Sequence, residues 1–338
     1  MRCLLIGNYG VGNLGDEVLR KYFLITFTEV EWVVVTCHGE LCRTMRQNSE
    51  CRTSTGLSVT HIVPRLPFGL RSLVTPWWRT VREYWRADSV VFGGGSLFTD
   101  SESIKAPLIW WWHACLAWIF GKPIFLAFQG IGPFRTTLGE WLTRWVVQHA
   151  TFVSVRDHAS FERVKKWRDD VVESFDPVFH SLSLSMERAR VMVSEKRDIL
   201  VLIPRSNSDD TFLHRAQDIY KTKSFDHVLI LSLQPDRACE KAVCKKVQEH
   251  IPSAQIISVH SLNELSRIIE SASFVFSERY HGALAALVHG IPFETVSQTQ
   301  GDKFDALRIL SKTQAIKLVQ DGDNALRLVL LSGASQNV

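Results

Sequence analysis

The sequence contains no C-x-x-C pair, in which two residues separate two cysteines, and no long hydrophobic run. Its seven cysteines are an odd number, which together with the missing C-x-x-C pair argues against a disulfide framework and a zinc knuckle. The longest apolar stretch, Pro107–Gly121, is shorter than the ~20 residues that a membrane-spanning helix needs. The N-terminal run lacks the apolar core and cleavage site of a signal peptide, so we interpret it as a strand. These absences favour a reducing, cytoplasmic setting.

A strong charge of either sign is absent as well. The chain carries 39 Lys and Arg against 35 Asp and Glu, a formal net charge of +4. This excess is too small to indicate a nucleic-acid partner, but it suits an anionic small substrate or an anionic membrane surface. With 46% hydrophobic and 22% charged residues, the composition excludes disordered, collagen-like and coiled-coil classes. A length of 338 residues suggests two domains.

Short apolar runs alternate with helical patterns in both halves of the chain, which predicts βαβ units and parallel sheets. The predicted strands are Arg2–Ile6, Trp32–Cys37, Ser89–Phe92, Ile124–Gln129, Phe152–Val155, Ile199–Ile203, His227–Ser232, Gln255–Val259, Phe274–Ser277 and Phe293–Ser297. The segment Phe175–Lys196 breaks this rhythm. We therefore predict an α/β fold of two Rossmann-like domains facing a cleft, residues 1–175 and 198–338, joined by a crossover over residues 176–197.

Glycine-rich loops follow three predicted strands of the first half. The loop Gly7–Gly15 contains four glycines before a helix, so a ligand can approach its backbone closely. Asp16 follows this loop, and we keep two interpretations of it: a helix N-cap, and a base or hydroxyl-binding group. Gly93–Gly95 follow one further strand and leave bare backbone facing a bulky group, and Gln129 ends another, where its amide can face a sugar. Both patterns are also typical of plain turns.

Arginines follow strands in both halves. Arg156 either pairs with Asp157 or reaches into the cleft, and Arg205 ends a strand of the second half, a suitable place for an anion site. The strongest signal is Arg279 with His281 at the start of a helix of small residues. Arg offers a bidentate fork to carboxylate or phosphate, and His exchanges protons near neutral pH. The structural alternative is a helix cap and a salt bridge.

Nine motifs occur along the chain between Gly7 and Leu307. They read GNYGVGNLGDE, VVFGGGSLFTD, AFQGIGPF, SVRDHAS, FDPVF, IPRS, LSLQPD, SERYHGALAALVHGIPF and GDKFDAL. Their order resembles the polysaccharide pyruvyl transferase family, and the run from Ser277 to Pro292 is the most diagnostic. The resemblance implies a GT-B-like fold. It also implies transfer of the enolpyruvyl group of phosphoenolpyruvate onto a sugar as a cyclic ketal, with release of phosphate and without an obligatory metal or any cofactor beyond this co-substrate.

Phosphoenolpyruvate carries a phosphate and a carboxylate, so its site needs several cations. We expect His281 to be the general acid, with Asp16 or Glu278 as the base. The second domain is expected to bind the donor and the tryptophan-rich first domain the acceptor, since all eleven Trp lie at or before Trp167. The donor-binding residues expected are Arg205, Arg279, Arg156, Lys303, Gln234 and Asp236. The acceptor-binding residues expected are Gly12, Asn13, Gly94, Gly95 and Gln129.

The segment Ile62–Trp85 combines tryptophans with arginines. Positions 65 to 86 contain five Arg against one Glu, and arginine with aromatic residues suits the headgroup region of an anionic bilayer. Together with Ile109–Phe120 the segment is a candidate for peripheral docking on the inner face of a membrane, where a lipid-linked saccharide acceptor would lie. The alternative is core packing beside a solvated basic loop.

The sequence is also compared with the features that three other functions require. A GT-B glycosyltransferase using a nucleotide sugar would share the two-domain cleft and a basic donor site. A non-catalytic scaffold would keep the fold, although Arg205, Arg279 and His281 argue against loss of activity. An NAD enzyme is disfavoured because Thr36-Cys37-His38 stands where an acid is expected. No group of cysteines and histidines completes a four-ligand set, so no metal site is predicted.

Overall fold

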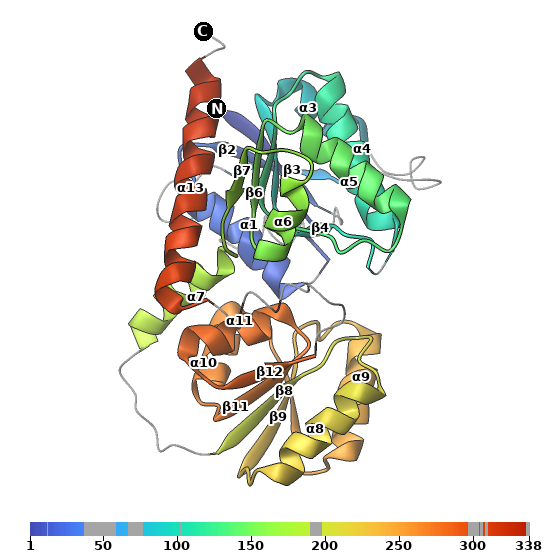
Figure 1. The fold of residues 1–338 in the computed structure, drawn as a ribbon, viewed down its shortest axis with the longest axis vertical. Coiled ribbons are helices and arrows are strands. Elements are labelled where there is room, and N and C mark those ends of the chain that lie inside the picture. The colour runs from blue at the N-terminus through green and yellow to red at the C-terminus, as the bar shows by residue number, and fades with distance from the viewer. Residues whose placement is uncertain are drawn as a thin grey trace. The chain divides into compact units, whose positions relative to one another are not determined.

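The computed structural model describes residues 1–11, 13–36, 59–66, 77–101, 103–189, 198–296, 304, 307 and 310–335. The chain forms two compact units, each described here by itself (Figure 1). Unit 1 comprises Met1–Val11, Asp16–Pro177 and Ile316–Val338, and unit 2 comprises Gly12–Gly15 and Val178–Ala315. Residues 316–338, expected in the second domain, therefore group with the first unit, and residues 12–15 group with the second.

Unit 1 is built on a parallel sheet with the strand order β3-β2-β1-β4-β5-β6-β7. The order reverses between β1 and β4, and such a switch point is where open α/β sheets bind ligands. The strands are β1 (Arg2–Ile6), β2 (Glu31–Thr36), β3 (Val59–Pro64), β4 (Ser89–Phe98), β5 (Ile124–Ile131), β6 (Phe152–Val155) and β7 (Val171–Glu173).

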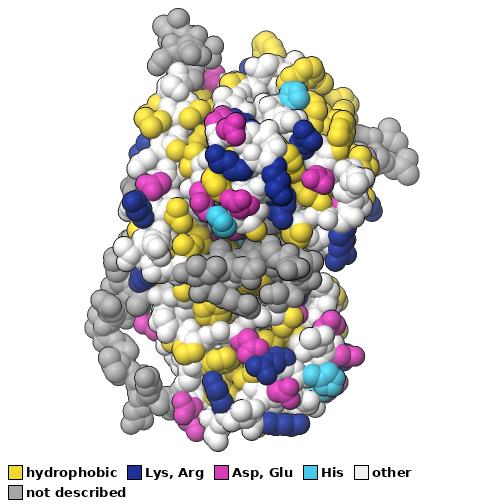
Figure 2. Space-filling view, viewed as in Figure 1, with side chains coloured by type: hydrophobic (Ala, Val, Ile, Leu, Met, Phe, Trp, Pro, Cys, Tyr) yellow, Lys and Arg dark blue, Asp and Glu magenta, His cyan; other side chains and the backbone are white. Residues whose placement is uncertain are grey.

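Alternate side chains of this sheet pack against different helices, as the two-residue repeat of a strand requires. Leu4 and Ile6 belong to the core formed with α3, α4, α5 and α6. Leu5 points the other way, toward Phe23 of α1. On the outer side of α4 and α5, hydrophobic side chains remain at the surface (Figure 2). The helices are α1 (Leu14–Thr26), α3 (Trp77–Arg86), α4 (Lys105–Ile119), α5 (Thr137–His149) and α6 (His158–Lys165).

The last helix, α13 (Lys312–Ser335), runs alongside α1 (Figure 1). Tyr22 of α1 donates a hydrogen bond to the carboxylate of Asp323, and the Arg327 guanidinium donates to the carbonyl of Thr26 over 2.7 Å. Gly322 permits close packing, because a Cβ there would lie 2.3 Å from the Ser174 Oγ. These contacts explain why the C-terminal residues group with unit 1.

Unit 2 is built on a second parallel sheet with the order β10-β9-β8-β11-β12, so its switch point lies between β8 and β11. Helices α8 and α9 cover one face through Phe212 and Val247, whereas α7, α10 and α11 pack together. The elements are α7 (Val178–Ala189), β8 (Ile199–Ile203), α8 (Asp210–Thr222), β9 (His227–Ser232), α9 (Ala238–His250), β10 (Gln255–Ser258), α10 (Leu262–Glu270), β11 (Phe274–Ser277), α11 (Tyr280–His289) and β12 (Phe293–Thr295).

The ends of two strands in unit 1 differ from the prediction. β4 and β5 continue beyond Phe92 and Gln129, through glycines that were expected to be turns. In β4 the glycines are required by geometry. Gly94 and Gly95 have φ of 73° and 86°, a region that other residues rarely adopt, and a Cβ on Gly93 would lie 2.5 Å from the Leu5 side chain.

Candidate functional site on the second unit

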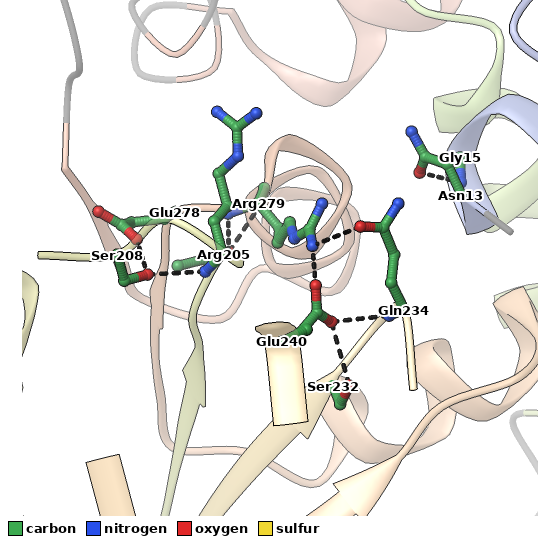
Figure 3. Close-up of polar contacts among 10 residues, drawn as sticks. Asn13, Gly15, Arg205, Ser208, Ser232, Gln234, Glu240, Glu278 and Arg279 are labelled. Atoms are coloured by element: carbon green, nitrogen blue, oxygen red, sulfur yellow. Dashed lines mark hydrogen bonds and ion pairs between the residues drawn. The ribbon is translucent and has the colours of Figure 1, made fainter. Parts of the chain in front are cut away.

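Polar side chains gather at the carboxyl edge of the unit 2 sheet. Because β9, β8 and β11 are neighbours, the segments that follow them meet at this edge. These segments supply Gln234 after β9, Arg205 after β8 and Arg279 after β11 (Figure 3). The three residues predicted from separate motifs therefore lie together at this edge, beside the switch point between β8 and β11.

Arg279 is held by an acid that the sequence analysis missed. Its guanidinium forms an ion pair with the fully buried Glu240 of α9 and donates a 3.0 Å hydrogen bond to the Gln234 Oε1 (Figure 3). Glu240 also accepts hydrogen bonds from the Gln234 backbone N–H, at 2.7 Å, and from the Ser232 hydroxyl, at 3.1 Å. The sequence did carry a signal: Glu240 is the third residue of α9 after Arg237, the N-cap, a position from which a glutamate reaches back to backbone N–H groups.

A second buried acid orders the loop after β8. The Ser208 hydroxyl donates to the carboxylate of Glu278 and accepts a 2.8 Å hydrogen bond from the Arg205 backbone N–H. Burial raises the pKa of Glu278 above its ordinary value, against the hydrogen bond from Ser208, which lowers it. In Figure 3 the Arg205 guanidinium extends away from this pair, whereas that of Arg279 is directed toward Glu240 and Gln234.

His281 lies in the first turn of α11, where Arg279 is the N-cap and makes no side-chain capping bond. The helix sits close to the sheet because Gly282 has no side chain: a Cβ there would lie 2.5 Å from the Ile203 Cδ1. The imidazole of His281 in turn lies against Gly15, whose Cβ would be 1.9 Å from the His281 Cε1. The imidazole is thus placed at a helix N-terminus, where N–H groups and the helix dipole favour an anion.

In the loop after β1, the predicted residues Asp16 and Asn13 make local hydrogen bonds, and the N-cap interpretation of Asp16 is wrong. Asp16 is not an N-cap, because α1 begins at Leu14; instead it accepts a 3.1 Å hydrogen bond from the Asn8 amide and is buried. Asn13 accepts a 3.3 Å hydrogen bond from the Gly15 N–H at the start of the helix (Figure 3). Gly95 lies beside Asp16, since a Cβ on Gly95 would be 3.3 Å from the Asp16 Oδ1.

Gln129, expected to face a sugar, is fully buried in unit 1. Its amide nitrogen donates to the carbonyl of Phe92 over 2.8 Å and to that of Ala127 over 3.2 Å. This side chain therefore ties β5 to β4. The neighbouring Gly94, also an expected acceptor residue, lies against the side chain of Leu19.

Arg156, expected at the donor, is buried in unit 1. It forms an ion pair with Asp176 and donates a 2.8 Å hydrogen bond to the Ser96 hydroxyl. Asp157, its expected partner, is instead the N-cap of α6 and accepts from the Ser160 N–H. Arg156 therefore forms an ion pair, as one of the two interpretations predicted, but with Asp176 and not with Asp157.

The remaining predicted residues are placed as follows. Asp236 is exposed, between β9 and α9. Gly12 and Lys303 lie outside the described residues. Across the part of the chain that the structure describes, no three His, Cys, Asp or Glu side chains are grouped as a metal site would require. The described helices also include none with the length and apolar character needed to cross a membrane.

Two parallel sheets with helices on both faces define a protein of the GT-B class, with two Rossmann-like units. Solved structures with this fold cover nearly the whole chain. UDP-GlcNAc 2-epimerase from Neisseria meningitidis, bound to UDP-GlcNAc, is 11% identical with a TM-score of 0.60, covering 98% of this chain and 100% of its own. The Rickettsia bellii UDP-N-acetylglucosamine 2-epimerase is 12% identical with a TM-score of 0.64 (100% and 98%). Anabaena Alr3699/HepE in complex with UDP and glucose is 11% identical with a TM-score of 0.58 (96% and 94%).

Such low identities establish the fold alone. The family is identified by sequence. The family model named polysaccharide pyruvyl transferase matches residues 13–297, and the chain belongs to this family. A search of curated proteins gives no significant match.

Proposed function

We propose that this protein transfers the enolpyruvyl group of phosphoenolpyruvate onto a sugar as a ketal and releases phosphate. The observation that carries the proposal is the placement of Arg279 and His281 at the N-terminus of α11, next to Arg205 at the switch point of the second sheet. A small anionic donor and a proton donor are both needed in such a reaction. This edge of unit 2 combines cationic groups, helix N–H groups and an imidazole.

In the proposed reaction, His281 in its protonated form donates a proton to the methylene carbon of phosphoenolpyruvate. The C2 carbon becomes electrophilic, and a sugar hydroxyl adds to it while a base takes the hydroxyl proton. The bond between C2 and the phosphate oxygen then breaks, phosphate leaves, and a second hydroxyl of the same sugar adds to C2 to close the ketal. The second hydroxyl also loses its proton, so one proton is consumed and two are released to bases or to the leaving phosphate.

Arg205 and Arg279 are the proposed donor-binding cations. The buried Glu240 holds the Arg279 guanidinium in one orientation, so this arginine is presented to a donor as a fixed group, which lowers the entropy lost on binding. We propose Glu278 or Asp16 as the base. Glu278 is supported by its place in the same unit as His281 and by its raised pKa, which makes the carboxylate a stronger proton acceptor.

The proposed acceptor is a saccharide of a cell-surface glycan precursor carried on a lipid. The family name supports a polysaccharide-related acceptor. We propose that the enzyme works in the cytoplasm, because phosphoenolpyruvate is an intermediate of cytoplasmic metabolism. No cofactor beyond this co-substrate takes part in the proposed steps.

A phosphate-release assay tests the proposal. Purified protein is incubated with phosphoenolpyruvate and a panel of aryl and lipid-linked glycosides. We expect phosphate release that depends on both substrates, and a loss of about 10²–10⁴-fold in kcat for His281→Gln. His214→Gln, a matched change at an exposed histidine of α8 in the same unit, should keep the activity. For Arg279→Lys we expect mainly a higher KM for phosphoenolpyruvate, since the bidentate fork is lost.

Nucleotide-sugar transfer is the competing function, because two of the solved structures with a similar fold are bound to UDP-GlcNAc or to UDP and glucose. Thermal melting with each donor distinguishes the two. Stabilisation by phosphoenolpyruvate, weakened in Arg205→Gln, supports the proposal. Stabilisation by a UDP-sugar alone, with no phosphate release from any acceptor, would overturn it in favour of a glycosyltransferase. Stabilisation by neither donor would point to a non-catalytic scaffold.

A further inference from the structure

An exposed aromatic surface on unit 1 has no part in the site described above. It is formed by helices α3, α4 and α5, of which α4 contacts both others. We define the tryptophan face as the exposed large apolar side chains of these helices. They are Trp77, Trp78, Trp85, Trp112, Trp118, Ile119, Leu138 and Trp141.

In α3 the exposed tryptophans are ordered by the helix repeat. At about 100° per residue, Trp77, Trp78 and Trp85 fall within roughly one quadrant. Thr80 and Tyr84 lie about 20–60° from Trp77, on the flank away from Trp78 and Trp85, and are buried. Trp85 is 68% exposed, so this helix buries one face in the protein and presents a second apolar face to the surroundings.

The next helix, α4, is apolar all round. Beyond Lys105 at its start it has no charged residue, and such helices are normally buried on every side. In this protein only one side is covered by the core: Trp112 and Trp118 are exposed, Trp118 by 57%. A soluble protein rarely leaves so much aromatic surface in water unless a partner covers it.

The third helix, α5, continues the surface. Trp145 packs edge-on against both Trp111 and Trp118 of α4, with ring centroids 6.1 and 6.2 Å apart. This packing places the outer side of α5, with Trp141 at 56% exposure, beside α4. Figure 2 shows hydrophobic side chains gathered along this side of unit 1, in the region of α4 and α5.

Cationic side chains accompany the tryptophan face. Arg79, Arg82 and Arg86 form a stripe on α3 next to its tryptophans, within about 60° of arc. Between residues 77 and 149, the described residues include seven Lys and Arg, and their exposed acids are Asp88 and Glu140. Glu83 is buried and paired with Arg2. The electrostatics therefore favour an anionic partner.

We propose that the tryptophan face docks on the surface of an anionic lipid bilayer, with α3, α4 and α5 lying in the headgroup region. Tryptophan is suited to this layer because its ring is apolar and its N–H can stay hydrated, and arginines beside it pair with lipid phosphates. A protein partner fits less well, because the surface combines exposed tryptophans with a cationic margin, the composition of interfacial helices. The inference does not depend on the proposed function.

Vesicle flotation of the full-length protein tests this proposal. We expect binding to vesicles that contain phosphatidylglycerol, weak binding to pure phosphatidylcholine, and release by high salt. Trp78→Ser/Trp85→Ser should lower the partition coefficient at least about tenfold. Arg79→Gln/Arg82→Gln should lower it by about fivefold per arginine at low salt.

Two matched variants serve as controls. Leu328→Ser/Leu331→Ser removes two exposed apolar side chains from α13, and Lys241→Gln/Lys245→Gln removes two exposed cations from α9. Both should bind like the wild type. Circular dichroism and thermal melting identify any variant that fails to fold; Trp112→Ser/Trp141→Ser on α4 and α5 then replaces the α3 pair.

The proposal is overturned if the wild type does not float with anionic vesicles. It is also overturned if both tryptophan pairs can be removed without loss of binding. Concentration-dependent self-association, abolished by the tryptophan variants in the absence of vesicle binding, would overturn it too and identify the face as a protein interface.

Discussion

At the scale of single residues, the ion pair of Arg279 with Glu240 is the clearest link between packing and chemistry. The sequence identified Arg279 from its place before a helix of small residues, because an arginine there has a recognisable chemical role. It did not identify Glu240, Ser208 or Ser232, because a glutamate in the first turn of a helix is ordinary and its burial depends on which strands become neighbours. Gln129 was misinterpreted for a similar reason: its amide meets backbone carbonyls of an adjacent strand.

The first prediction concerns this pair. Because Glu240 is fully buried, Glu240→Ala leaves the Arg279 guanidinium without its carboxylate, and we expect the free energy of unfolding to fall by about 3–5 kcal/mol. Urea denaturation measures the change. Glu249→Ala, at an exposed position of the same helix, should change it by less than about 0.5 kcal/mol. Equal effects of the two substitutions would show that the ion pair does not support the unit.

At the scale of elements, the alternation of apolar runs predicted most strands, although β4 extends well beyond its predicted end at Phe92. It missed both edge strands of unit 1. One is β3, which contains Pro64, a residue that is tolerated at a sheet edge, and the other is β7, which is only three residues long. It also missed α3, because the tryptophans and arginines of this segment were interpreted as a basic loop or a docking segment. The segment interpreted as a crossover contains α7, and α13 was not predicted.

The second prediction concerns the contact between α1 and α13. Burial raises the pKa of Asp323 from 3.8 to about 6, although the Tyr22 hydrogen bond acts in the opposite direction. A carboxyl whose pKa is higher in the folded state stabilises the fold fully below its unfolded pKa. That contribution is lost as the pH rises through about 6. The shift corresponds to at most about 3 kcal/mol.

Asp323→Asn imitates the protonated side chain and removes this loss. We therefore expect the variant to gain stability relative to the wild type as the pH rises from about 4 to 7, approaching the ~3 kcal/mol limit. Urea denaturation at a series of pH values measures the difference. Asp321→Asn, on an exposed position of α13, should stay within about 0.5 kcal/mol of the wild type throughout. A difference for Asp323→Asn that does not vary with pH would contradict the assignment.

At the scale of the whole molecule, the α/β fold with two parallel sheets could be predicted from the sequence, and the family model and the solved structures agree with that fold. The membership of residues 12–15 and 316–338 in their units could not. A prediction from sequence assigns each segment to the same domain as its neighbours in the chain. The contacts of Gly15 with His281, and of Gly322 with Ser174, instead depend on tertiary packing between residues far apart in the sequence. The candidate site was therefore predicted as a set of motifs, and the structure supplied their partners.

The identity of the group that is transferred tests the central claim most directly. The protein is incubated in heavy water with an acceptor glycoside, phosphoenolpyruvate and UDP-sugars together, and the product is analysed by mass spectrometry. The account predicts a pyruvate ketal whose methyl group carries one deuteron from the solvent, formed with an equal amount of phosphate and not formed by His281→Gln. A product that carries a sugar residue from the nucleotide donor, with no deuteron in the transferred group, would contradict it.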